Sequence, residues 1–159
     1  MPSLLEGVRV IEFSHVMAAP TCGLMLSDMG ADVIKVERLP DGDSIRKLAP
    51  FVNGVSGPFA MMNRNKRGVA LNLGSQDGRG ILKNLIIGSD VFIENYRPGA
   101  MEHYGIDYEQ VKQANSKLIY CSLSGYGRTG PYAAKGGFDL VAQGTVSYTH
   151  LTLPTILLV

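Results

Sequence analysis

The side chains best suited to bind a ligand lie in loops that follow runs of apolar residues. These loop positions are His15–Pro20, Arg38, Asn95–Gly99 and the glycine-rich stretch before Phe138. Arginine carries a planar, permanently charged guanidinium that suits a phosphate group, and Ala18 and Ala19 would let a ligand approach the backbone closely. Tyr96 could stack on a flat ring. Together these residue types favour a nucleotide-like ligand that carries phosphates.

Each of these features also has a purely structural explanation. The basic run Arg64, Lys66 and Arg67 equally suits a solvated turn, His15 a hydrogen-bonded loop and Tyr96 a half-buried rim. Neither G-x-G-x-x-G after the first strand nor G-x-x-x-x-G-K-[ST] occurs, which argues against a dinucleotide fingerprint and a P-loop. The histidines and cysteines do not have the spacing of metal ligands, so no metal site is expected.

Strands and helices must alternate to place these loops together. The stretch Val8–Glu37 predicts one βαβ unit, with Pro20 in the first helical turn and Gly30 as the cap. Five apolar runs predict an α/β fold with a Rossmann-like parallel sheet and flanking helices: Val8–Phe13, Val33–Val36, Val69–Leu73, Val91–Glu94 and Leu118–Leu123. Helices are expected from Pro20, after Ser75, at Tyr108–Ala114 with Asp107 as its N-cap, and at Phe138–Gln143.

Residues 39–59 break the alternation of strands and helices. This segment is rich in proline and glycine, and we expect a long excursion with one short helical turn, followed by a short helix at Phe59–Asn63. A loop of this length inside an α/β domain is often functional.

Composition restricts the class of protein. Of the 159 residues, 45% are hydrophobic and 18% charged, which is typical of a globular chain. The net charge of +1 argues against a nucleic-acid binder or a membrane-surface binder. Cys22 and Cys121 are expected to be reduced core thiols, and neither a signal peptide nor a transmembrane stretch is visible. We therefore expect a cytoplasmic protein.

An ordered set of motifs makes the chain resemble a known family. From Leu4 to Gly144 it is similar to the family III CoA-transferases (CaiB/BaiF family), which include formyl-CoA transferase, through LEGVRVIEFSHVMAAP, GADVIKVER, NRNKRGVALNL, VFIENYRPGAMEHYG and GYGRTGPYAAKGGFDLVAQG. The resemblance implies the N-terminal part of a large domain, an interlocked homodimer for the whole protein, and acyl-CoA and a carboxylic acid as substrates. It implies coenzyme A as a ligand and no prosthetic group.

The resemblance also implies which residues contact coenzyme A. They are Met17, Ala18, Arg38, Leu71, Asn72, Leu73, Gly74, Asn95, Tyr96, Arg97, His103, Lys135 and Phe138. Two of them depart from the formyl-CoA transferase pattern, because Met17 replaces a glutamine and His103 replaces an arginine. The first weakens any expectation of formyl or oxalate specificity, and the second is expected to reduce phosphate affinity.

The family mechanism uses an aspartate nucleophile that lies beyond FDLVAQG, and no position of this chain matches it. We therefore expect no catalytic residue here and an inactive fragment, with Asp139 acting as a cap or a packing carboxylate. Racemases of the family place a histidine where this chain has Phe138, so CoA transfer through an aspartyl-CoA intermediate is preferred over an α-methylacyl-CoA racemase. An inactive CoA-binding fragment is a further alternative, and a nicotinamide-dependent oxidoreductase is the weakest.

The end of the chain differs from the rest. We expect residues 1–144 to be part of the CoA-transferase large domain and residues 145–159 to be a non-native read-through tail, because VSYTHLTLPT resembles a translated sequencing adapter. The alternative is a threonine-rich edge strand.

Overall fold

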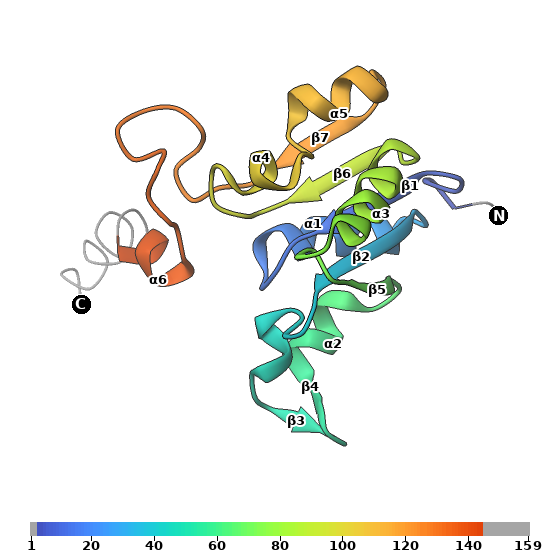
Figure 1. The fold of residues 1–159 in the computed structure, drawn as a ribbon. Coiled ribbons are helices and arrows are strands. Elements are labelled where there is room, and N and C mark those ends of the chain that lie inside the picture. Colours follow the sequence, from blue (N-terminus) through green and yellow to red (C-terminus); the bar gives the residue numbers. More distant parts are fainter. Residues whose placement is uncertain (1–2, 145–159) are drawn as a thin grey trace. The chain divides into compact units, whose positions relative to one another are not determined.

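The computed structural model describes residues 3–144 (Figure 1). The contacts divide the chain after Leu123 into two compact units, each of which is described by itself. The first unit contains the sheet and nearly all the helices. The expected division at residue 144 concerns a tail that lies outside the described residues, and it stays a prediction.

The first unit is built on a five-stranded, fully parallel sheet, as the sequence predicts. The strand order is β5-β2-β1-β6-β7, and the strands are β1 (Arg9–Phe13), β2 (Asp32–Arg38), β5 (Arg67–Leu71), β6 (Val91–Glu94) and β7 (Ile119–Ser122). The chain reverses its direction of travel between β1 and β6, which is where parallel sheets usually open a ligand crevice. Strand β5 ends at Leu71, so Leu73 belongs to the following turn rather than to the strand.

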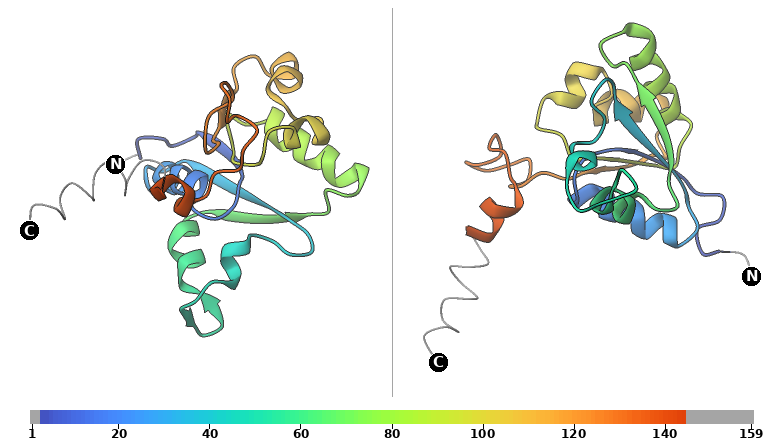
Figure 2. Two further views of the ribbon diagram at one scale, coloured as in Figure 1. Left: turned by 90° about the vertical axis from the view of Figure 1, so that its left-hand side faces the viewer. Right: turned by 90° about the horizontal axis from the view of Figure 1, so that it is seen from below.

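Helices cover both faces of the sheet (Figure 2). Helix α1 (Ala18–Asp28) packs over a core that includes Val10, Val33 and Ile93. Helices α3 (Gln76–Ile87), α4 (Ala100–Tyr104) and α5 (Tyr108–Ala114) flank the second core, which includes Phe13 and Phe92. The near-continuous apolar strands of the sequence are explained by this double cover.

Local signals in the sequence predicted the helix ends well. The Ser75 hydroxyl accepts a hydrogen bond from Gly78 N at 3.0 Å and caps α3. The Asp107 carboxylate caps α5 in the same way. Gly30 follows α1 with a φ of 97°, a conformation that favours glycine. Helix α1 begins two residues before Pro20, which sits in the first turn, where its missing N–H leaves no intrahelical bond unmade.

The excursion after β2 has more regular structure than the sequence indicated. It contains a 3-10 helix η1 (Ser44–Lys47), a hairpin of β3 (Phe51–Val52) and β4 (Val55–Ser56), and α2 (Gly57–Asn63). The hairpin was missed because two-residue strands show no period in the sequence. The expected helical turn and short helix are confirmed.

The Glu37 carboxylate fastens this excursion to the end of β2. Arg46 donates to it through Nε at 2.7 Å and Nη2 at 2.6 Å, and Asp43 N donates at 2.9 Å. The Arg46 guanidinium also lies 3.6 Å from the centre of the Phe59 ring. Burial alone would raise the pKa of Glu37, but these donors outweigh it and hold the pKa below its ordinary value.

Four buried charges link the strands to the excursion. Lys35 Nζ lies 3.1 Å from Glu12 Oε1, 3.0 Å from Asp43 Oδ2 and 3.1 Å from Ser14 O. Lys66 Nζ lies 2.7 Å from Glu12 Oε2 and also donates to Pro20 O and the Asn63 side chain. Each ammonium therefore donates two hydrogen bonds, and it meets its remaining carboxylate oxygen, Asp43 Oδ2 or Glu12 Oε2, as an ion pair only. We refer to Glu12, Lys35, Asp43 and Lys66 as the buried charge cluster.

Burial lowers the pKa of Lys66, and the neighbouring Glu12 carboxylate opposes that effect. Gly23 of α1 lies directly over Glu12, and a Cβ built at this position would overlap Glu12 Oε2. A larger residue at this position would therefore have to displace the Glu12 carboxylate.

The second unit contains α6 (Asp139–Ala142), which confirms a short helix within the range Phe138–Gln143. Gly125 and Gly137 meet back to back, since a Cβ on either would overlap the backbone of the other. Asp139 is exposed and accepts a hydrogen bond from Gln143 Nε2 at 2.7 Å. The cap position belongs to Phe138, so the expectation that Asp139 is a cap or a packing carboxylate was wrong.

No helix among residues 3–144 combines the length and the apolar character needed to cross a membrane.

The first prediction concerns Gly23→Ala. Because the added methyl group would displace the Glu12 carboxylate from its lysines, the free energy of unfolding should fall by about 1–3 kcal/mol, as for other overpacked sites. The matched control is Gly80→Ala in α3, where a Cβ meets no atom within 4 Å. That change should raise stability by about 0.5–1 kcal/mol, because alanine favours the helix. Urea unfolding measures both, and equal responses would refute the overlap.

The second prediction concerns acid stability. The folded-state pKa of Glu37 is lower than its ordinary value of 4.5, so the unfolded chain takes up a proton first as pH falls. The stabilisation is complete above about pH 4.5 and is lost as pH drops toward the folded pKa. The difference in unfolding free energy between the wild type and Glu37→Gln should therefore shrink in acid. A difference that stays constant down to pH 3 would contradict this.

Candidate functional site

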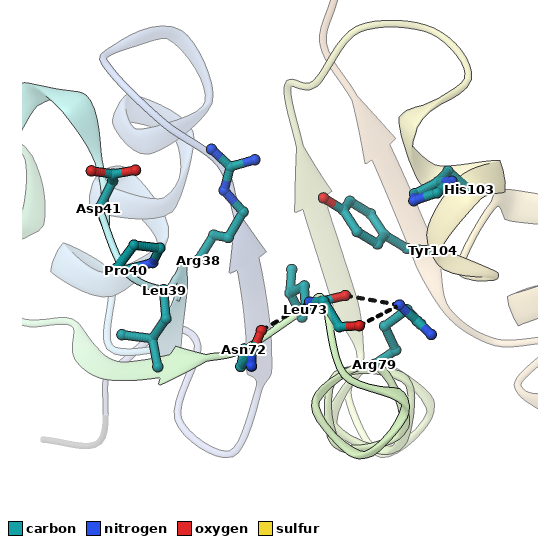
Figure 3. Close-up of a pocket in the computed structure, with 10 residues that line it drawn as sticks. Arg38, Leu39, Pro40, Asp41, Asn72, Leu73, Arg79, His103 and Tyr104 are labelled. Atoms are coloured by element: carbon teal, nitrogen blue, oxygen red, sulfur yellow. Dashed lines mark hydrogen bonds between the residues drawn. The ribbon is translucent and has the colours of Figure 1, made fainter.

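A pocket of about 430 Å³ lies at the carboxyl edge of the sheet (Figure 3). Its walls come from the end of β2 and the start of the excursion, from the turn after β5, from the first turns of α3 and from α4. The residues that line it are Arg38, Leu39, Pro40, Asp41, Asn72, Leu73, Gly74, Arg79, His103 and Tyr104. Five of the residues that the family resemblance implies are thereby brought together: Arg38, Asn72, Leu73, Gly74 and His103.

The turn after β5 forms one wall and exposes its backbone. The Asn72 side chain accepts a hydrogen bond from Gly74 N at 3.0 Å, and Ser75 Oγ donates to Asn72 O at 2.8 Å. The Leu73 side chain is buried in the core and anchors the turn. Leu71 is also a core residue and is not among the residues that line the pocket. Its carbonyl accepts a hydrogen bond from Leu39 N at 3.0 Å.

Two arginines face the pocket without a carboxylate partner. In the part of the chain that the structure describes, no acidic oxygen lies within ion-pairing distance of Arg38 or Arg79. Arg79 Nη1 donates to Leu73 O at 3.0 Å and to Gly74 O at 3.3 Å, both of them uncharged acceptors. Asp41 also lines the pocket but lies 3.5 Å from Lys47 Nζ. The pocket is therefore suited to an anion.

The loop after β1 is held to two neighbouring segments. Asn95, which follows β6, accepts from His15 N at 3.0 Å and donates to His15 O at 2.8 Å. Asp43 accepts from Val16 N at 3.0 Å, and Val16 has a φ of 65°. These bonds fix the loop so that Met17, which follows it, is exposed at the start of α1 together with Ala18. Asn95 is thus a bridge across the point where the strand order reverses.

The Tyr96 ring is already occupied on one side. It stacks on Phe13 with ring centres 4.4 Å apart and meets His15 edge-on at 4.9 Å. Burial raises the pKa of the Tyr96 hydroxyl, so the phenol stays protonated. Its expected stacking on a ligand ring is therefore limited to the remaining face, and the half-buried rim description fits better. The neighbouring Arg97 is exposed.

His15 is half-buried beside these rings. Its Nδ1 atom is buried and has no hydrogen-bond partner among the described residues. Burial lowers the pKa of His15, Asp43 raises it, and Lys35 and Arg38 lower it, so the net direction is downward. The imidazole is therefore neutral at pH 7.

The basic run that follows α2 does not reach the pocket. Arg64 pairs with Asp28, and Arg67 pairs with Asp32 at 2.6 Å. Lys66 is buried against Glu12. The sequence suggested either a phosphate-binding run or a solvated turn. Lys66 fits neither description, because its side chain is buried and does not line the pocket.

The remaining site predictions fall in the second unit. Lys135 Nζ lies 4.1 Å from the centre of the Tyr132 ring, and Phe138 is 62% exposed. Their proposed role in coenzyme A binding stays a prediction.

Sequence reasoning missed Arg79 and Tyr104. Arg79 lies five residues beyond Gly74 and reaches back over the turn from α3, and Tyr104 follows the expected contact His103 in α4. The signal for Arg79 would have been its place in the first turns of the helix that follows the turn Leu71–Gly74, from where its side chain can reach back to that turn. Within residues 3–144, no cluster of histidine, cysteine, aspartate or glutamate side chains could hold a metal ion.

The chain is similar to several known proteins. The chain is 42% identical to a succinate–glutarate CoA-transferase of Agrobacterium fabrum over 155 residues, covering 93% of this chain and 39% of the relative. It is also 42% identical to a succinyl-CoA:glutarate CoA-transferase of Mus musculus, covering 94% of this chain and 35% of the relative. A crystal structure of a CaiB/BaiF family protein from Brucella suis superimposes with a TM-score of 0.85 at 41% identity, covering 91% of this chain and 39% of that one.

The chain thus spans about two fifths or less of the length of these relatives. The likeness to the Brucella suis protein confirms the expected α/β architecture for the part that is present. The sequence pattern of CoA-transferase family III matches residues 5–155, which is nearly all of the chain. The chain belongs to CoA-transferase family III.

Proposed function

We propose that the pocket binds the phosphate-bearing end of coenzyme A. The observation that carries this proposal is the pair of arginines, Arg38 and Arg79, which line one pocket with no carboxylate partner among the described residues. Coenzyme A has a diphosphate and a 3′-phosphate, and a guanidinium fork matches phosphate oxygens. The exposed Asn72 and Gly74 add polar groups that could orient the ligand.

The proposed site extends beyond the pocket to the loops after β1 and β6. Met17, Ala18 and Arg97 are exposed there, and the Asn95–His15 hydrogen bonds hold the two loops together. In the sheet order, β1 lies between β6 and β2, and β2 carries Arg38 at its end. An elongated ligand anchored in the pocket could therefore run along the sheet edge toward Met17.

For the whole protein we propose transfer of CoA between an acyl-CoA and a carboxylic acid. An aspartate beyond Gly144 would attack the thioester carbonyl, forming a mixed anhydride and releasing CoA thiolate. The thiolate would attack the aspartyl carbonyl, giving aspartyl-CoA and the free donor acid. The acceptor acid would then take its place by the same two steps in reverse. The residues described here would bind and orient the coenzyme.

The names of the two relatives suggest the substrates to test first. Protein expressed from the complete gene, mixed with succinyl-CoA and glutarate, should form glutaryl-CoA, which mass spectrometry detects. If a broad panel of acids yields no exchanged thioester, the transferase proposal fails. The family resemblance also supports an interlocked homodimer, which light scattering on the same protein would test.

The third prediction concerns Arg38→Met. Arg38 is exposed and forms no ion pair with a described residue, so its removal should leave the fold intact. A lost charge-assisted hydrogen bond is worth about 1.5–3 kcal/mol, so coenzyme A binding to the 159-residue chain should weaken about 10- to 100-fold. Isothermal titration calorimetry measures the change. The matched control, Lys117→Met, removes one charge just before β7, at the opposite edge of the sheet. Equal affinities for both variants would refute the role of Arg38.

A further inference from the structure

Arg79 is held in place by groups that leave its charge unneutralised. Its Nη1 donates to the carbonyls of Leu73 and Gly74, while Nε and Nη2 have no partner among the described residues. A guanidinium has five N–H donors, so those on Nε and Nη2 remain for a ligand. The side chain is half-buried, which limits its freedom before any ligand arrives.

The position of Gly74 leaves room beside this guanidinium. Residue 74 has no side chain, and its backbone is exposed on the pocket wall. Arg79, reaching back from the first turns of α3, supplies the positive charge at this wall, since Gly74 has no side chain. The turn and the helix therefore act together as one anion-binding wall.

The acidic group in the pocket does not cancel this charge. In Figure 3, Asp41 and Arg79 lie on opposite sides of the pocket, with Arg38 between them. Asp41 Oδ1 is also 3.5 Å from the Nζ atom of Lys47, a residue that does not line the pocket. An anion in the pocket would thus meet two cations, and the one carboxylate among the lining residues, Asp41, pairs with Lys47.

We propose that Arg79 and Arg38 grip one phosphate group of coenzyme A from two sides, and that Arg79 determines specificity for that phosphate. The inference rests on the proposed function, and it adds a residue that the family resemblance did not imply. The phosphate belongs to the 3′ position of the ribose or to the diphosphate, and the two sources respond differently to removal of the 3′-phosphate.

The fourth prediction is a cycle of two ligands and two proteins. Coenzyme A and 3′-dephospho-CoA are titrated calorimetrically into the 159-residue wild-type chain and into Arg79→Met. Coenzyme A should bind Arg79→Met about 10- to 100-fold more weakly than the wild type. If the 3′-phosphate is gripped, the two proteins bind 3′-dephospho-CoA equally, and if the diphosphate is gripped, both ligands lose the same factor.

Two controls separate a binding role from a structural one. Lys83→Met removes a charge from the same helix outside the pocket lining, and it should change coenzyme A affinity less than twofold. Thermal unfolding reports whether loss of the Leu73 and Gly74 contacts disturbs the fold. If Arg79→Met does not fold, Arg79→Gln keeps a donor for the carbonyls without the charge and should show the same weakening.

The outcomes also separate this inference from the proposed function. If the wild type binds coenzyme A and the Arg79 variants bind it equally well, the role of Arg79 is overturned while the pocket assignment survives. If the wild-type chain does not bind coenzyme A, both proposals are overturned together.

Discussion

The buried charge cluster is the interaction on which the rest of the structure depends. Glu12 and Lys35 are register partners on β1 and β2, Lys66 precedes β5, and Asp43 belongs to the excursion. Two carboxylates and two ammonium groups balance, and each ammonium donates two hydrogen bonds. Such a cluster contributes little net stability compared with apolar packing, but removing one member leaves a buried charge uncompensated. It therefore penalises any arrangement of these four segments that separates its members.

The cluster positions the candidate site through Asp43. The same carboxylate pairs with Lys35, caps η1 through Ile45 N and holds Val16 N of the loop after β1. Glu37, one residue before Arg38, is likewise fully used by Arg46 and by the Asp43 backbone. These acids near the sheet edge are thus engaged internally. Because these carboxylates are paired elsewhere, they do not neutralise Arg38 and Arg79, whose charges can act on a ligand in the pocket.

The strands and helices could be predicted from the sequence, because residues close together in the chain determine them. Apolar runs and capping residues such as Ser75 and Asp107 located the strands and helices, because their signals lie within a few residues. The buried charge cluster could not be predicted, since Glu12 pairs with Lys35 only through the register of two strands. Arg79 was missed for a related reason, because it lines the pocket by folding back from a helix. Of the pocket residues that were anticipated, Arg38 was indicated by its place after an apolar run, whereas Asn72, Leu73, Gly74 and His103 came from the family resemblance.

The sheet order explains why the pocket and the loop after β1 can serve one elongated ligand. Strands β5, β2 and β1 are consecutive neighbours, and adjacent strands lie roughly 4.8 Å apart, so their carboxyl ends fall within about 10 Å of each other. Arg79 stands at the β5 side of this edge and Met17 at the β1 side. On the proposed function, the anionic end of coenzyme A is held at β2 and β5 while the rest of the molecule is directed toward β1. Binding and acyl chemistry would then be separated along the edge of one sheet, and the buried cluster would set the distance between them.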